Sequence, residues 1–114
     1  MPVVSVVIPL HNCEKTVRKS FRSLVNQTYK DFEVIAVDNN CTDDTIKIIK
    51  SEFSNLLDIK IVECKDQGIE PALNTGLRSC SSDLIARQDG DDYWLPEKLE
   101  KQVAFLIENP EVDI

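Results

Sequence analysis

Hydrophobic residues along the chain follow two alternating patterns. Short runs of apolar, often β-branched residues predict four strands, at residues 3–8, 33–37, 59–63 and 84–86. Apolar residues spaced three or four positions apart predict a helix after each strand, over about residues 13–26, after Thr42, from Pro71, and from Pro96 to about 108. In the third helix, Leu73 and Leu77 should lie on one side. Strands that alternate with helices predict a parallel sheet covered on both faces, a three-layer α/β/α fold with right-handed crossovers.

Polar residues and prolines indicate where these elements begin and end. Pro9 should end the first strand because proline lacks the backbone N–H group of a sheet ladder. Asn12 and Thr42 are suited to cap the first and second helices. Pro71 suits the start of the third helix. Lys60 lies within the third strand and indicates that this strand is less buried and more peripheral than the others.

Acidic residues gather where the predicted strands end. Ligands of such sheets bind beyond the carboxyl ends of the strands. The segments that directly follow the four strands are residues 11–12, 38–40, 66–68 and 89–92. Three of these four segments contain aspartate, so we expect a ligand site along this edge of the sheet.

The segment Asp89-Gly90-Asp91-Asp92 holds three carboxylates in four residues. Hard cations such as Mg²⁺ or Mn²⁺ take oxygen ligands and often combine one or two carboxylates with substrate phosphates. Gly90 should let the backbone turn sharply and let a ligand approach. The alternative is an acidic turn that suits the dipole of the last helix. A calcium loop is disfavoured because its glycine position holds Trp94.

Three further residues have both a functional and a structural interpretation. Asp38 closes a strand and can accept hydrogen bonds from a base or ribose, or form an Asx turn. His11, the only histidine, is either a ligand contact or a loop residue. Gly68, next to a helix start, can present backbone N–H groups to a phosphate. This last signal is weak because the chain has neither a P-loop nor a G-x-G-x-x-G segment.

Composition limits the classes of function. The 114 residues fit a single domain, residues 1–114. Twenty acidic and 13 basic residues give a net charge of -7, which disfavours nucleic acid as a partner. The four cysteines lack C-x-x-C spacing, so we expect reduced thiols and no zinc site. We find neither a transmembrane segment nor a signal peptide, and expect a cytoplasmic protein, peripheral to a membrane only through another part or partner.

Six segments, taken in order, resemble family-2 inverting glycosyltransferases. They are residues 5–12, 23–33, 37–45, 72–77, 85–92 and 95–102. Together they cover essentially the whole chain, which makes the resemblance far more specific than any one segment. It implies a GT-A fold, a Rossmann-like and mostly parallel sheet, here truncated after about four βα units.

The resemblance also implies a nucleotide-sugar site. The Asp89-to-Asp92 segment corresponds to the DXD motif, which binds Mn²⁺ or Mg²⁺ on the donor diphosphate and contacts the ribose. By analogy Asp92 is the metal ligand, and Asp91 faces the ribose and is the second metal candidate. The residues implied in nucleotide-sugar binding are Pro9, His11, Asp38, Asn39, Gly68, Asn74, Arg87, Asp89 and Asp91.

Two departures from the family pattern affect these roles. Asn39 stands where the family often has a second acid. Leu73 stands where many members have an arginine that contacts the diphosphate, and Arg87 is the candidate replacement.

The family's catalytic domain continues well beyond the DXD region, where its acceptor site and general base lie. We therefore expect the base beyond Ile114 and assign no catalytic residue here. The chain is interpreted as the N-terminal, donor-binding half of a hexosyltransferase that uses a nucleotide sugar, with UDP favoured, and a saccharide, lipid or protein acceptor. Alone it should be inactive and expose an apolar edge that favours self-association. The alternative is a non-catalytic nucleotide-sugar-binding or assembly module.

Overall fold

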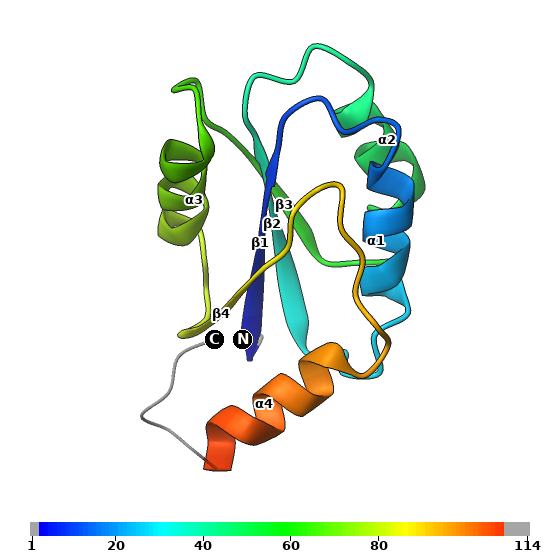
Figure 1. Cartoon of the computed structure of the whole chain (residues 1–114), viewed down its shortest axis with the longest axis vertical. Coiled ribbons are helices and arrows are strands. Elements are labelled where there is room, and N and C mark those ends of the chain that lie inside the picture. The colour runs from blue at the N-terminus through cyan, green and yellow to red at the C-terminus, as the bar shows by residue number, and fades with distance from the viewer. Residues whose placement is uncertain (1–2, 109–114) are drawn as a thin grey trace.

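The computed structural model describes residues 3–108, in which strands and helices alternate strictly (Figure 1). The elements are β1 (Val4–Leu10), α1 (Val17–Val25), β2 (Phe32–Asp38), α2 (Thr45–Glu52), β3 (Ile59–Glu63), α3 (Ile69–Arg78), β4 (Leu84–Arg87) and α4 (Lys98–Glu108). Every strand and helix expected from the hydrophobic pattern is present.

The four strands form one sheet in the order β3-β2-β1-β4, and every pair is parallel. The two central strands, β1 and β2, are almost completely buried. β3 lies at an edge, as Lys60 indicated. Because all strands run in one direction, the four loops that follow them meet at a single edge of the sheet, which we call the rim.

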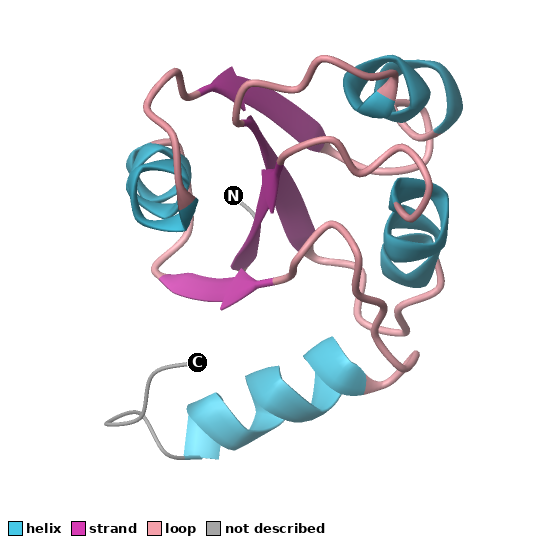
Figure 2. Ribbon diagram, turned by 45° about the horizontal axis from the view of Figure 1, so that its top comes forward, coloured by secondary structure: helices cyan, strands magenta, loops and turns pink. Residues whose placement is uncertain are grey.

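Helices cover both faces of the sheet (Figure 2). Val4, Val6, Ile8 and Leu10 of β1 pack in one core with α1, α2 and α4. Val7, on the opposite face of the same strand, packs in a second core with α3. This alternation follows from the two-residue period of a strand. The three-layer α/β/α arrangement is therefore confirmed.

Helix α3 contacts the sheet through its smallest residues. Ala72 and Gly76 are buried, and Leu73 packs beside them. Leu77, which was expected on the same side of the helix as Leu73, is 46% exposed. A Cβ atom on Gly76 would lie 2.5 Å from Cγ1 of Val7. The helix thus approaches β1 more closely than a leucine at the contact would permit.

Pro9 does not end the first strand, which continues to Leu10. The carbonyl of Leu10 accepts a hydrogen bond from the N–H of Asn39 on the β2 side, at 2.8 Å. The carbonyl of Val7 accepts from the N–H of Gln88 on the β4 side, at 3.0 Å. The alternation along β1 turns the imino nitrogen of Pro9 toward β4, where pairing has already ended. No ladder bond is lost, and the proline is accommodated.

Asn12 does not cap α1, which begins at Val17. Its backbone is left-handed, with φ 52°. Its Oδ1 atom accepts hydrogen bonds from the N–H groups of Thr42 and Asp43, at 2.7 and 3.3 Å. Asn12 therefore joins the loops after β1 and β2 across the rim.

Thr42 does not cap α2 either. That helix begins at Thr45, and the carboxylate of Asp43 accepts hydrogen bonds from the N–H and hydroxyl of Thr45 at 3.0 and 2.6 Å. Both cap assignments failed because the loops bond to each other across the sheet, which local sequence does not reveal.

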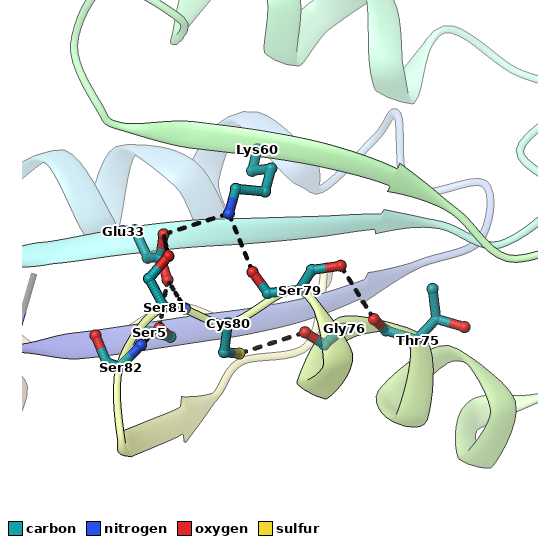
Figure 3. Close-up of polar contacts among 9 residues, drawn as sticks. All are labelled: Ser5, Glu33, Lys60, Thr75, Gly76, Ser79, Cys80, Ser81 and Ser82. Carbon is teal, nitrogen blue, oxygen red and sulfur yellow. Dashed lines mark hydrogen bonds and ion pairs between the residues drawn. The ribbon is translucent and has the colours of Figure 1, made fainter. Parts of the chain in front are cut away.

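A buried carboxylate ties the sheet together at the edge opposite the rim (Figure 3). Glu33 of β2 is 4% exposed and accepts hydrogen bonds from the Ser5 hydroxyl at 2.5 Å and the Ser81 N–H at 2.6 Å. The Nζ atom of Lys60, on β3, lies 3.9 Å from Oε1 of Glu33. Burial alone would raise the pKa of Glu33, but these hydrogen bonds and Lys60 outweigh it and lower the pKa. The carboxylate joins β1, β2, β3 and the loop before β4.

All four cysteines lie within the described residues and are free. Within residues 3–108, no helix has both the length and the apolar character needed to cross a membrane.

Candidate functional site

The acidic segment forms the loop directly after β4, on the rim. Asp91 and Asp92 are exposed. Asp89 is half-exposed and pairs with Arg87, whose Nη2 lies 3.1 Å from the Asp89 Oδ1. Arg87, the candidate for the missing diphosphate contact, is therefore occupied with the acidic loop itself.

The backbone of this loop is held by the start of α1. The Thr16 hydroxyl donates to the carbonyl of Gly90 at 3.0 Å, and the Ser20 hydroxyl donates to the carbonyl of Asp89 at 3.3 Å. The N–H of Asp92 closes a turn onto the same Asp89 carbonyl at 3.1 Å. The main chain thus faces inward, while the side chains of Asp91 and Asp92 are exposed on the rim.

Gly90 lies in the turn that the Asp92 N–H closes onto the Asp89 carbonyl, as expected, and it is also required for close packing. It is buried, and it does not adopt positive φ. A Cβ atom there would lie 2.8 Å from both the Cys13 Sγ and Leu10 Cδ2 atoms. The glycine lets the acidic loop rest on the loop after β1.

The acidic side chains line two different hollows. Asp91 lines one together with His11 and Asp43. Asp92 lines the other together with Tyr93. Among residues 3–108, no three His, Cys, Asp or Glu side chains converge closely enough to enclose a metal ion. A cation at this rim would have to take most of its ligands from a substrate or from water.

The loops after β1, β2 and β3 are linked in series. The carbonyl of Asn39 lies 2.8 Å from Nδ1 of His11. Since a carbonyl only accepts, Nδ1 carries the hydrogen, and in the neutral ring Nε2 is an acceptor. The Asn39 side chain is 6% exposed and donates through Nδ2 to the carbonyl of Gly68 at 2.9 Å. Asn39 therefore orients His11 and holds Gly68 in place.

Asp38 holds the loop after β2 through a hydrogen bond to the backbone three residues on, one residue beyond the span of the Asx turn that was one of its two interpretations. Its Oδ1 atom accepts a hydrogen bond from the N–H of Cys41 at 3.0 Å. The Cys41 thiol also interacts with this carboxylate, and Asp38 is half-exposed on the rim, where a ligand can reach it.

The other three candidates are distributed around the rim. Gly68 precedes α3 with φ 114°, a conformation that favours glycine. Asn74 lies one turn into α3 and is exposed. Pro9 is buried within β1 and lies directly before His11. The structure therefore brings His11, Asn39 and Gly68 into one hydrogen-bonded series, with Pro9 and Asn74 at its margins.

The electrostatics of the rim are those of carboxylates, not thiolates. Burial raises the pKa of Cys13, and raises that of Cys41 to about 11. Both thiols therefore stay neutral near pH 7. Burial would raise the pKa of Asp43, but hydrogen bonds from Thr45 and from the N–H of Glu14 lower it. Oxygen ligands of this kind suit a hard cation.

Sequence reasoning missed the polar residues beneath the acidic loop. Thr16 and Ser20 lie four residues apart at the start of α1, so they share one face of the helix, and both bond to the loop. Gln88, directly before Asp89, is 1% exposed. The available signal was a pair of small polar residues four positions apart at the N-terminal end of an apolar helix stripe.

A family model and individual sequence relatives both match most of this chain. The family model described as glycosyl transferase family 2 matches residues 5–114. EpsE of Bacillus subtilis (strain 168) is 43% identical over 107 residues, which are 92% of this chain and 38% of that protein. UDP-Glc:alpha-D-GlcNAc-diphosphoundecaprenol beta-1,3-glucosyltransferase WfaP of Escherichia coli is 38% identical over 107 residues, 93% of this chain and 42% of that protein. The chain thus spans well under half the length of these relatives.

Solved structures agree with the sequence relatives. The crystal structure of S. aureus TarS 1-349 in complex with UDP matches with a TM-score of 0.85 and 30% identity, over 93% of this chain and 32% of that one. The mannosyltransferase PcManGT from Pyrobaculum calidifontis, in complex with GDP-Man and Mn²⁺, matches with a TM-score of 0.84 and 28% identity, over 92% and 32%. The chain belongs to glycosyl transferase family 2 and has the α/β, Rossmann-like GT-A fold.

Proposed function

We propose that this chain is the donor-binding half of a hexosyltransferase. The whole protein transfers a sugar from a UDP-sugar to an acceptor hydroxyl with inversion. One observation carries the proposal: exposed Asp91 and Asp92 stand on the same rim as His11 and Asp38, at the strand ends where such folds bind ligands. The match to a UDP complex of TarS supports UDP as the nucleotide.

In this proposal Asp92 binds Mn²⁺ or Mg²⁺, and Asp91 contacts the ribose or serves as the second ligand. The residues fit such an ion, because a single exposed carboxylate, that of Asp92, together with diphosphate oxygens and water forms an ordinary site for a hard cation. The bound metal supplies charge neutralisation of the departing diphosphate. The Mn²⁺ complex of the related PcManGT supports this assignment.

The remaining rim residues bind the nucleotide. Asp38 accepts a hydrogen bond from the base through its carboxylate. Pro9 and His11 flank the base. Asn39 contributes by orienting His11 and holding Gly68.

The diphosphate side of the donor is assigned to the start of α3 and the end of β4. Gly68 and Asn74, at and near the start of α3, offer an N–H group and an amide. Arg87 is held by Asp89, and this pair supports the diphosphate side of the acidic loop.

No residue here is proposed as the general base. A base must reach the acceptor hydroxyl on the face of the sugar opposite the leaving group, whereas Asp91 and Asp92 are assigned to the leaving-group side. We expect the base and the site for a saccharide, lipid or protein acceptor in the part of the protein beyond Ile114. Residues 1–114 alone should therefore bind donor but not transfer sugar. A cytoplasmic location, peripheral to a membrane, is the corresponding prediction for the whole protein.

Calorimetric titration of UDP tests the proposal. We expect tighter binding with Mn²⁺ than with a chelator, and expect Asp92→Ala to remove the difference. Asp58→Ala is the matched control, because Asp58 is also exposed but lies at the opposite end of the strands, before β3. Equal affinity of the unmodified chain with Mn²⁺ and with chelator would overturn the metal assignment. Metal-dependent binding by both this chain and a longer protein that transfers no sugar would favour the binding-module alternative.

A further inference from the structure

Gln88 is a buried amide directly before the acidic loop. Its side chain is 1% exposed. Its Nε2 atom lies 3.1 Å from the Ser20 carbonyl oxygen, 2.5 Å from the Ser20 hydroxyl and 3.2 Å from the Asp92 carbonyl oxygen. One N–H is shared by the two oxygens of Ser20, and the other reaches Asp92. The amide thus bridges α1 and the far end of the acidic loop.

The bridge continues through Ser20. Its hydroxyl accepts from Gln88 and donates to the carbonyl of Asp89 at 3.3 Å. Thr16 holds the carbonyl of Gly90 at 3.0 Å. Three of the four loop carbonyls are therefore bonded inward.

The orientation of the Gln88 amide is determined by its surroundings. All three groups around Nε2 are oxygens, two of them carbonyls that can only accept. If the amide oxygen and nitrogen were exchanged, Oε1 would face the two carbonyl oxygens, which cannot donate a hydrogen bond to it. The Oε1 atom is buried and has no hydrogen-bond partner within the described residues. A buried acceptor without a partner costs stability, so this glutamine is a poor choice for the core alone.

We propose that Gln88 is a positioning residue of the donor site. It fixes the path of the acidic loop and so the direction in which the Asp91 and Asp92 carboxylates leave the rim. This inference rests on the proposed function, because it treats those carboxylates as the ligands of the metal and ribose. Residues that orient metal ligands in this way typically change metal affinity by about 10- to 100-fold when they are replaced.

Gln88→Met tests the inference, since methionine keeps the unbranched shape and removes the amide. We expect the Mn²⁺-dependent gain in UDP affinity to fall about tenfold or more, and metal-free UDP binding to weaken less, through the ribose contact assigned to Asp91. Gln27→Met is the matched control. Gln27 is also fully buried, but its amide bonds to Ser23, Leu95 and Leu99, outside the acidic loop. Its Mn²⁺-dependent gain should equal that of the unmodified chain.

Amide hydrogen exchange over residues 89–93 supplies a readout that does not depend on the donor. Exchange there should be faster in Gln88→Met than in Gln27→Met. Unchanged exchange together with an unchanged Mn²⁺ gain in folded Gln88→Met would overturn the positioning role. A missing Mn²⁺ gain in the unmodified chain would instead overturn the proposed function, and the exchange data would still test Gln88.

Ser20→Ala provides a second variant if Gln88→Met does not fold. It removes the hydroxyl between Gln88 and Asp89. We therefore expect the Mn²⁺-dependent gain in UDP affinity to fall and amide exchange over residues 89–93 to become faster, both by less than in Gln88→Met. If both variants fold, their effects should not add, because the two side chains act through one bridge. Ser20→Ala with unchanged gain and exchange, or fully additive effects, would overturn the bridge.

Discussion

The Nδ1 atom of His11 donates a hydrogen bond to the carbonyl oxygen of Asn39, at 2.8 Å. This contact joins the loops after β1 and β2 and fixes which ring nitrogen faces the rim. A substitution can therefore test the structural role of His11 separately from its proposed role in ligand binding.

His11→Asn separates the two parts, because the asparagine amide can replace Nδ1 but nothing replaces Nε2. We expect unchanged stability and a loss in UDP affinity of about 1 kcal/mol, or roughly fivefold. The loss should be equal with Mn²⁺ and with chelator, since His11 is not assigned to the metal. Unchanged titration curves would remove His11 from the site.

Asp38→Asn should weaken binding of uridine and UDP alike while the fold is retained. The asparagine Oδ1 can still accept from the N–H of Cys41, but its amide nitrogen would meet a donor of the base. We expect a loss of about 1–3 kcal/mol in binding free energy, with the Mn²⁺ gain retained. Asp38→Ala, which also loses the hydrogen bond to Cys41, should show the same binding defect together with lower stability in urea. A defect in stability alone would leave Asp38 a structural residue of its loop.

Gly76→Ala should destabilise the protein without touching the rim. The new Cβ atom would lie 2.5 Å from Cγ1 of Val7 and 3.0 Å from Cγ2 of Val37, so α3 must move away from the sheet. The expected cost is about 1–3 kcal/mol in the free energy of unfolding, measured by urea denaturation. Leu77→Ala is the control on the next residue of the helix, and should cost less because Leu77 is 46% exposed. Equal costs would contradict this packing.

Glu33 should make stability depend on pH. Its pKa is lower in the folded state than the ordinary value of about 4.3. The carboxylate therefore stabilises the fold fully above that ordinary value, and its contribution is lost as the pH falls through the lower, folded-state pKa. Glu33→Gln should cost roughly 1–3 kcal/mol near pH 7, and the difference from the unmodified chain should shrink as the pH falls below about 4.3.

Urea denaturation between neutral and acidic pH measures this difference. Glu63→Gln is the control, because Glu63 is an exposed glutamate on β3. If the difference in unfolding free energy between Glu33→Gln and the unmodified chain stayed constant over the whole pH range, it would contradict the lowered pKa of Glu33.

The order of strands and helices and the position of the acidic loop could be predicted from residues alone. Both depend on local periodicity, because a run such as Val4 to Ile8 buries both its faces only in a sheet covered by helices. The common direction of the strands then places Asp38, Gly68 and Asp91 at the same rim.

Contacts between loops distant in the sequence were decided by the tertiary structure. Asn12 bonds to Thr42 instead of capping α1, and Leu77 is displaced from the sheet by the closer fit of Gly76. The amide of Gln88 lies between Ser20 and Asp92 only because the fold brings α1 against the acidic loop. A hydrogen bond or a close approach depends on which groups meet in space. Residues that are 30, 68 or 69 positions apart have no local sequence pattern that predicts such a contact.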